Sequence, residues 1–256
     1  EKNEFLYELS NGHLGKNIRS VEINDNYIWT GGEDGQIIKW SLNHQKEKKI
    51  EQKKNNILNC SLSNTDEQSK KAKIKQKNFT PCVKVLKFIN ENMLLIGSNN
   101  GKVASYNIKE KKQDKDYLND DQVRVINSIE VVLNKFILVG LSDGNIQLIN
   151  MEKPQEENIT IKIFHNIRIP FISHKIFSES IEMFLFISTA LGRTKIYYFD
   201  NIKDITFTSF KEKLINENKD YLELHTGARY AVGISSCEIV KTKHPKYYIV
   251  LLGDYD

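Results

Sequence analysis

Residues 12–40 read "GHLGKNIRSVEINDNYIWTGGEDGQIIKW", and their pattern carries the strongest structural signal in the chain. A Gly-His pair opens it, a Gly-Gly-x-Asp-Gly turn lies near its end, and a Trp closes it. Short apolar runs stand on both sides of the turn, and glycine tolerates the positive φ that tight turns require. The pattern predicts a β-hairpin over residues 27–40.

The hairpin pattern recurs along the chain. It is found again as "MLLIGSNNGKVASY" (93–106) and "FILVGLSDGNIQLI" (136–149), and more weakly as "LFISTALGRTKIYY" (185–198). The segment "YYIVLLGDYD" (247–256) begins a fifth copy. Further short strands are expected beside these hairpins, over residues 5–9, 17–23, 82–89, 125–132, 159–164, 171–177, 221–225 and 233–240. Only residues 210–220 have helical character.

Units of three or four short strands, repeated five times, are typical of propeller blades. We therefore predict an all-β fold over residues 1–256, a WD40-type β-propeller with about five recognisable blades. The last unit stops within its hairpin, and natural propellers avoid unpaired strand edges by closing. We accordingly expect the chain to be part of a larger propeller or of a multi-propeller protein.

Composition excludes several classes of protein. Hydrophobic residues make up 39% of the chain, enough for a packed core. The cysteines, Cys60, Cys82 and Cys237, are scattered, which fits neither a disulfide framework nor a zinc site. They indicate a reducing compartment, the cytoplasm or alternatively the nucleus. No apolar run is long enough to span a membrane, and the first ten residues lack a signal-peptide pattern.

The positive charge is concentrated in one insertion, residues 44–78. It holds 10 Lys against 4 acidic residues, a local charge of +6, whereas the whole chain carries +4. Such a Lys/Asn/Gln-rich tract is typical of a solvated, low-complexity loop. Residues 56–62 within it can still supply the outer strand of the first blade. Direct contact with RNA phosphates is the alternative, although the insertion has no aromatic residue for base stacking.

The first unit contains the residues of a specific polar network. In WD repeats a His before the inner strand, a Ser/Thr on the second strand, an Asp in the turn and a Trp on the third strand hydrogen-bond in series. Here these are His13, Thr30, Asp34 and Trp40. A buried indole N–H needs an acceptor, and a hydroxyl both accepts and donates. We therefore interpret the His-Asp pair as structural; a catalytic triad would need an exposed nucleophile.

The later units lose this network. Tyr106 stands where Trp40 would be, with Asn100 in the turn. Asp143 keeps the acid, but Leu148 or Ile149 occupies the Trp position. Apolar packing is expected to hold these blades instead.

The segment "NGHLGKNIRSVEINDNYIWTGGEDGQIIKWSLN" resembles one blade of the WD-repeat subunit that partners a FtsJ-type tRNA 2′-O-ribose methyltransferase. The shared features are the Gly-His-x-Gly opening, the following Ile-Arg, "TGGEDG" and the closing "IIKWSL". The next blade of that family resembles "VKVLKFINENMLLIGSNNGKVASYNI". This resemblance implies a non-catalytic subunit that helps the methyltransferase modify the tRNA anticodon loop. S-adenosylmethionine would then bind the partner enzyme, so this chain needs no cofactor.

Two other classes of function remain open. A generic WD40 scaffold in another intracellular complex would bind a protein or peptide at its loop ends. The candidate partner-binding residues are Lys16, Arg19, Glu33, Asn99, Ser142 and Arg193. An enzyme is not expected, because the sequence has no phosphate-binding Gly-rich loop, nucleophile elbow or metal-ligand spacing.

Overall fold

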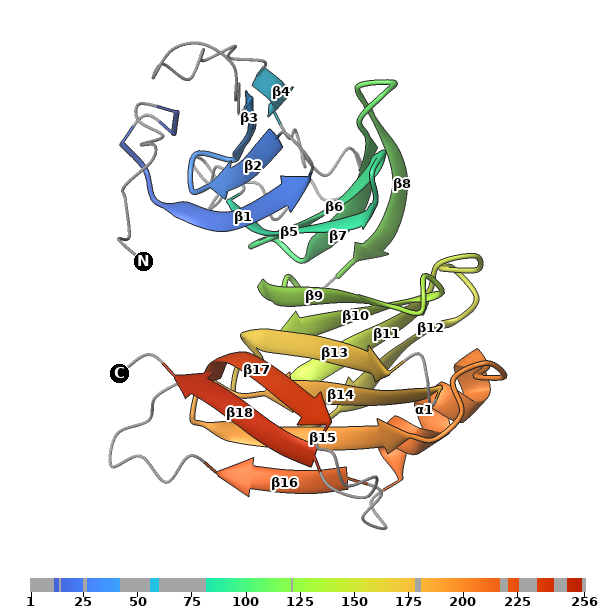
Figure 1. Ribbon diagram of the computed structural model, residues 1–256. Helices are drawn as coiled ribbons and strands as arrows, with labels where there is room; N and C mark the ends of the chain where they lie inside the picture. The colour runs from blue at the N-terminus through green and yellow to red at the C-terminus, as the bar shows by residue number, and fades with distance from the viewer. Residues whose placement is uncertain are drawn as a thin grey trace. The chain divides into compact units, whose positions relative to one another are not determined.

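The computed structural model describes residues 12–13, 15–24, 27–41, 56–59, 82–120, 122–177, 181–216, 221–225, 234–241 and 248–254. Four four-stranded antiparallel sheets and a two-stranded sheet account for the strands in these ranges (Figure 1). The chain forms two compact units, Glu1–Val123 and Arg124–Asp256. The first unit contains two of the four-stranded sheets and the second contains the other three sheets.

The first sheet contains the opening stretch of sequence. Its strands follow one another in chain order: β1 (Ile18–Asn24), β2 (Tyr27–Gly32), β3 (Gln36–Ser41) and β4 (Asn56–Asn59). The predicted hairpin is therefore present as β2 and β3. Strand β4 lies within residues 56–62, where an outer strand was expected, and it pairs with β3.

The second sheet has the same order: β5 (Val83–Asn90), β6 (Met93–Ser98), β7 (Lys102–Asn107) and β8 (Lys112–Asn119). Strand β8 was not predicted from the sequence. Its residues are mostly charged or polar, and only Tyr117 and Leu118 are buried. An outer strand needs little apolar surface because only part of it faces the core.

The second unit repeats the arrangement. One sheet consists of β9 (Ile126–Val132), β10 (Phe136–Leu141), β11 (Asn145–Asn150) and β12 (Asn158–Lys162). The next consists of β13 (Phe171–Phe177), β14 (Glu182–Ser188), β15 (Arg193–Phe199) and β16 (Tyr221–His225). Strands β17 (Ile234–Lys241) and β18 (Tyr248–Asp254) form a hairpin. The strand expected over residues 5–9 lies outside the described residues.

A single helix, α1 (Phe207–Ile215), connects β15 to β16 in the part of the chain that is described. It begins and ends earlier than the expected 210–220. Thr206 caps its N-terminus by accepting from the Ser209 backbone N–H, and Asn216 leaves the helical conformation at its C-terminus. These caps explain the shift, because a hydroxyl that satisfies a free N–H fixes where a helix starts.

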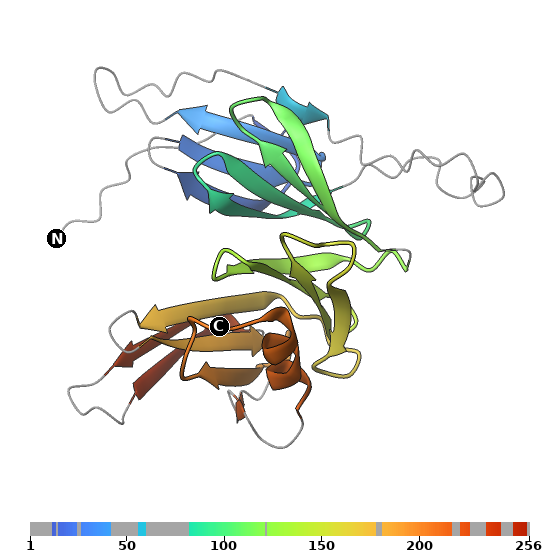
Figure 2. The same ribbon diagram turned by 90° about the vertical axis from the view of Figure 1, so that its right-hand side faces the viewer.

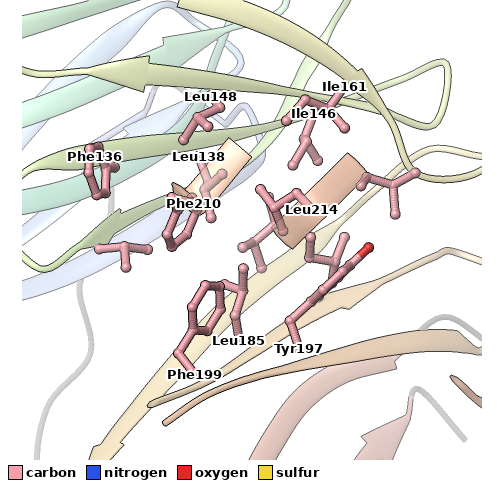
Figure 3. Close-up of a cluster of buried hydrophobic side chains, with 14 of the residues drawn as sticks. Phe136, Leu138, Ile146, Leu148, Ile161, Leu185, Tyr197, Phe199, Phe210 and Leu214 are labelled. Atoms are coloured by element: carbon pink, nitrogen blue, oxygen red, sulfur yellow. The ribbon is translucent and has the colours of Figure 1, made fainter. Parts of the chain in front are cut away.

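The core of the second unit lies between two sheets and α1. Phe210 and Leu214 are the buried residues of the helix. Figure 3 shows them pointing into a cluster of apolar side chains from both sheets, and Figure 2 shows α1 beside these sheets. The Phe210 ring lies 5.0 Å from that of Phe199 and 5.2 Å from that of Phe136, between centroids. Burying each large side chain stabilises the fold by about 1.5–3 kcal/mol.

The core of the first unit joins its two sheets. Trp29 and Ile37 of the first sheet pack against Val83, Leu86 and Tyr106 of the second. The Ser20 hydroxyl of β1 also accepts a hydrogen bond from the Leu86 backbone N–H at 2.9 Å. The two inner strands, β1 and β5, are therefore tied by a polar contact as well as by apolar burial.

Candidate functional site: a buried polar network and the turns around it

Four side chains from the opening stretch form one hydrogen-bonded series. Trp40 Nε1 donates to Thr30 Oγ1 at 2.8 Å. Thr30 Oγ1 also lies 2.8 Å from His13 Nε2. His13 Nδ1 lies 2.9 Å from Asp34 Oδ1. The structure therefore brings together all four residues of the series expected from the sequence.

One order of donors and acceptors satisfies every member of this series. The indole N–H can only donate, so the Thr30 oxygen accepts from it and its own proton is left to donate to His13 Nε2. His13 then carries its proton on Nδ1, which donates to the Asp34 carboxylate. Asp34 Oδ1 also accepts from the Gln36 backbone N–H at 3.0 Å, which fixes the turn. In this order His13 donates from Nδ1 and accepts at Nε2.

Glycines make room for these side chains. A Cβ on Gly12 would clash with the Trp40 ring, and a Cβ on Gly32 would clash with His13 Nδ1 and lie 2.7 Å from Asp34 Oδ1. Gly35 closes the turn with a φ of +73°, a conformation that costs other residues energy. The Gly-His pair and the Gly-Gly-x-Asp-Gly turn are therefore one packing unit with the closing Trp.

This network is buried, which decides its chemistry. Thr30 is 1% exposed and the Trp40 ring 3% exposed. The Thr30 hydroxyl is occupied on both sides by Trp40 and His13. A hydroxyl in this setting cannot reach a substrate, so the arrangement lacks the exposed nucleophile of a triad. It can instead hold the β2–β3 turn in one position.

Strand register identifies the equivalent positions in the later sheets. Trp40 is paired with Ile28, and in the same place Tyr106 is paired with Leu94. The third sheet has Ile149 there, paired with Ile137, which resolves the sequence ambiguity between Leu148 and Ile149. The fourth sheet has Tyr197, paired with Leu185. The position that Thr30 occupies is filled in these sheets by Ile96, Val139 and Ile187, so the network cannot form.

Parts of the turn survive where the network is lost. Asp143 occupies the position of Asp34, and its Oδ1 accepts from the Asn145 backbone N–H at 3.1 Å. Its second oxygen, Oδ2, accepts hydrogen bonds from Arg124 Nη1 at 3.2 Å and from Asn145 Nδ2 at 2.6 Å. In the second sheet, Asn100 takes this position and bonds to the Ser98 hydroxyl. The turn chemistry thus persists without the buried series.

Burial also raises the pKa of two tyrosines, Tyr106 and Tyr197, which occupy the position equivalent to Trp40. It raises the pKa of the Tyr106 hydroxyl above its usual value. It raises the pKa of Tyr197 further, and the nearby Tyr221 adds to this effect. Both hydroxyls are therefore neutral at physiological pH, as apolar packing requires.

Three candidate partner-binding residues gather around the turns of the first unit. Arg19 Nε donates to Glu33 Oε1 at 2.8 Å, and Asn17 Nδ2 donates to Glu33 Oε2 at 3.0 Å. The Arg19 contact holds the pKa of Glu33 below its usual value. Asn99 Oδ1 accepts from the Cys82 backbone N–H at 2.8 Å.

The other candidate partner-binding residues are Lys16, Ser142 and Arg193. Lys16 is exposed, and its backbone N–H closes a turn onto the His13 carbonyl at 2.7 Å. Ser142 is exposed in the β10–β11 turn of the second unit. Arg193, also in the second unit, donates from Nε and Nη2 to Glu223 Oε1 at 2.8 and 2.5 Å. Of the six candidates, the structure thus brings Arg19 and Glu33 into direct contact.

Two polar pairs in the structure were not predicted from the sequence. One is Arg193 with Glu223, on neighbouring strands β15 and β16. The other is His174 with Glu130, where Nδ1 lies 2.7 Å from Oε1 between the inner strands of two sheets. No local signal joins such residues, because each pair depends on strand register or on packing between sheets. Within the described ranges, no group of three or more His, Cys, Asp or Glu side chains could hold a metal ion.

Comparison with known proteins places the fold. No protein-family model and no curated protein match the sequence. Among solved structures, the WD40 domain of Toxoplasma gondii coronin matches 91% of this chain and 52% of that chain, with a TM-score of 0.56 and 9% identity. The Cps50 (Swd1) β-propeller domain of Myceliophteria thermophila matches 75% and 56%, with a TM-score of 0.48 and 12% identity. The computationally designed Ika4 protein matches 77% and 99%, with a TM-score of 0.48 and 15% identity.

The chain therefore spans about half the length of the coronin chain that it matches. No helix in the described part is long and apolar enough to cross a membrane. The sheets repeat one four-stranded antiparallel meander, and the similarity to the coronin domain extends over most of them. The predicted fold class is confirmed: the chain is all-β and is built from blades of the WD40 β-propeller type.

Proposed function

We propose that this chain is a non-catalytic scaffold that binds another protein through the turns of its first unit. The observation that carries the proposal is the use of His13. Its two ring nitrogens are engaged by Thr30 and Asp34, and the imidazole is 2% exposed. The His13–Asp34 pair, which the sequence offered as a candidate for catalysis, therefore holds a turn instead.

The surface over that network suits a binding role. Arg19 and Glu33 are side by side on it, with side chains 42% and 30% exposed. The buried series beneath fixes the turn that carries Glu33, so these charges are presented in one arrangement. A preorganised surface costs less ordering entropy on binding than a mobile one does. Charged pairs at such a rim contribute mainly to specificity and to association rate.

For the partner, we propose a FtsJ-type tRNA 2′-O-ribose methyltransferase. The support is the resemblance of "NGHLGKNIRSVEINDNYIWTGGEDGQIIKWSLN" to a blade of its WD-repeat subunit. The chain would then act on the anticodon loop only through the enzyme, which would bind S-adenosylmethionine itself. A scaffold in another intracellular complex is the alternative.

The test is affinity purification of the full-length protein from its own cells, followed by mass spectrometry. Three baits are compared: the natural sequence, Arg19→Glu, and Lys109→Glu as the control. Lys109 is exposed beyond β7, at the opposite end of its sheet from Asn99, and its substitution makes a similar charge change. We expect a partner that the natural bait and the Lys109→Glu bait recover and the Arg19→Glu bait loses.

The outcomes separate the two levels of the proposal. A scaffold is contradicted if no protein is enriched over a bait-free control. The turn surface is contradicted if Arg19→Glu retains every partner. A methyltransferase among the partners supports the tRNA role, and ribose methylation in the anticodon loop should then fall on depletion of this chain. Recovery of a different complex removes the methyltransferase and leaves the scaffold.

A further inference from the structure

The second unit contains a cationic pocket that the scaffold role does not use. The pocket has a volume of about 310 Å³ and is lined by the loop after β12, by strands β15 and β16, and by the C-terminal end of α1. Its lining includes the cations of Lys162, Arg193 and Lys195, and one carboxylate, that of Glu223. The aromatic rings in the lining are those of Phe164 and Tyr221.

Phe164 lines this pocket, and backbone contacts fix its position. Its N–H donates to the Gly144 carbonyl at 2.9 Å. Gly144 has a φ of +89°, and a Cβ there would lie 2.6 Å from the Phe164 carbonyl oxygen. The turn glycine of the third sheet therefore allows the loop to pass close and to bury the Phe164 ring.

Two cations lie over that ring. Arg193 Cζ and Lys195 Nζ are each 5.3 Å from the Phe164 centroid. Lys195 Nζ is also 4.3 Å from the Tyr221 centroid. Attraction to the ring faces holds the cations at the pocket without neutralising them.

Glu223 orients one of these cations. Arg193 donates to Glu223 Oε1 from Nε and Nη2, and its side chain remains 38% exposed. Lys195 and Glu223 are direct cross-strand partners in the β15–β16 register. Among the residues that the structure describes, no salt bridge joins Lys162 or Lys195 to a carboxylate. Two ammonium groups are thus available to a ligand.

Charge narrows the class of ligand. Three cations and one carboxylate leave a net charge of +2 on the lysine, arginine and glutamate side chains of the lining. A phosphomonoester carries about −1.5 to −2 at pH 7, whereas a carboxylate or a phosphodiester carries about −1. The volume is near the lower end for ligand pockets, roughly 300–1,000 Å³. A monoester therefore matches both the charge and the size.

The same contacts disfavour single-stranded nucleic acid. Base stacking needs open aromatic faces, but Lys195 lies over both rings and Arg193 over Phe164. The carboxylate of Glu223 would also repel a continuous phosphate backbone. These features favour a compact dianion at one point.

We propose that this pocket binds a phosphomonoester group, with Lys195, Lys162 and the free edge of Arg193 as its ligands. Two sources carry this chemistry: a phosphorylated serine or threonine of another protein, and a small free phosphomonoester. The site does not depend on the turn surface of the first unit. Its test therefore succeeds or fails independently of the scaffold proposal.

The test is a titration of the chain at low ionic strength, followed by ³¹P NMR and calorimetry. The probes are N-acetyl-O-phosphoserine amide and adenosine 5′-monophosphate, with dimethyl phosphate as the monoanionic control. We expect saturable binding of a monoester and much weaker binding of the diester. Binding should weaken as the pH falls below about 6, where the monoester takes up a proton.

Variants locate the binding. Charge-assisted hydrogen bonds are worth enough that Lys195→Met or Lys162→Met should weaken binding roughly tenfold or more. Lys203→Met, at an exposed lysine outside the pocket, should leave the affinity unchanged. Circular dichroism melts check that each variant is folded. If Lys195→Met does not fold, Lys162→Met, at an exposed lysine, still tests the site.

The results distinguish the sources and can overturn the site. Tighter binding of the phosphoserine probe assigns a phosphorylated protein, and tighter binding of the nucleotide assigns a free monoester. The proposal fails if neither monoester binds saturably, if dimethyl phosphate binds equally well, or if Lys203→Met weakens binding as much as the pocket variants do.

Discussion

The Thr30→Val substitution tests the buried network most directly. Valine has nearly the same shape as threonine, so packing around β2 is kept while the hydroxyl is removed. Two buried groups then lose their partner: the Trp40 indole N–H and His13 Nε2, both 2.8 Å from Thr30 Oγ1. The structure offers neither of them another acceptor or donor in the described network.

The expected loss of stability follows from that count. Leaving a buried polar group unsatisfied costs about 1–3 kcal/mol. Two such groups predict a decrease in the free energy of unfolding of about 2–6 kcal/mol, and valine's gain in hydrophobicity offsets a small part of it. Thr30→Ser is the matched control, because it keeps the hydroxyl and removes only a methyl group, at a cost of about 1 kcal/mol.

The assay can isolate the first unit. The chain has two tryptophans, Trp29 and Trp40, and both are buried there. Urea unfolding followed by tryptophan fluorescence therefore reports on this unit alone. A double-mutant cycle with Trp40→Phe should show that the two changes are not additive, since each removes the same hydrogen bond.

A small effect of Thr30→Val would contradict the proposed role of the hydroxyl. If Thr30→Val lowers the free energy of unfolding by less than about 0.5 kcal/mol, the hydroxyl does not satisfy the two neighbours. Equal losses for Thr30→Val and Thr30→Ser would also contradict it, because then packing rather than hydrogen bonding would be responsible.

Three further predictions can be checked with the same protein. The ¹⁵N NMR shifts of His13 should show a protonated Nδ1 and an unprotonated Nε2, and the reverse tautomer would contradict the proposed order of donors. Gly32→Ala should destabilise the first unit by about 1–3 kcal/mol in the fluorescence assay, since the added methyl group clashes with His13. Because the pKa of Tyr197 is raised by burial, its contribution to stability is complete below about pH 10 and is lost as the pH rises. Urea unfolding followed by circular dichroism should therefore show a fall of up to about 1.4 kcal/mol per pH unit above pH 10 that Tyr197→Phe lacks; equal pH slopes in the two proteins would refute it.

The hairpins could be predicted because their signals are local. The final glycine of each turn in the four-stranded sheets has a positive φ, and apolar runs flank every turn; these glycines are Gly35, Gly101, Gly144 and Gly192. The buried series could be named for the same reason, since its members lie within one hairpin and the turn before it.

The rest depends on contacts that sequence patterns do not encode. Strand β8 is almost wholly polar, and pairing with β7 rather than apolar alternation makes it a strand. The Arg193–Glu223 pair forms across the β15–β16 register, with α1 between the two strands in the chain. The cationic pocket therefore becomes visible only when the loop after β12 is placed against these strands.

The third sheet keeps enough of the turn to be used as a recipient in protein engineering. Asp143 already occupies the place of the network's carboxylate, and the register equates Val139 with Thr30 and Ile149 with Trp40. Grafting a threonine and a tryptophan at those two positions would give a second blade three of the four members of the series. The change in stability would measure how much the threonine, the tryptophan and the carboxylate contribute to a WD40-type blade when they are transferred without the histidine.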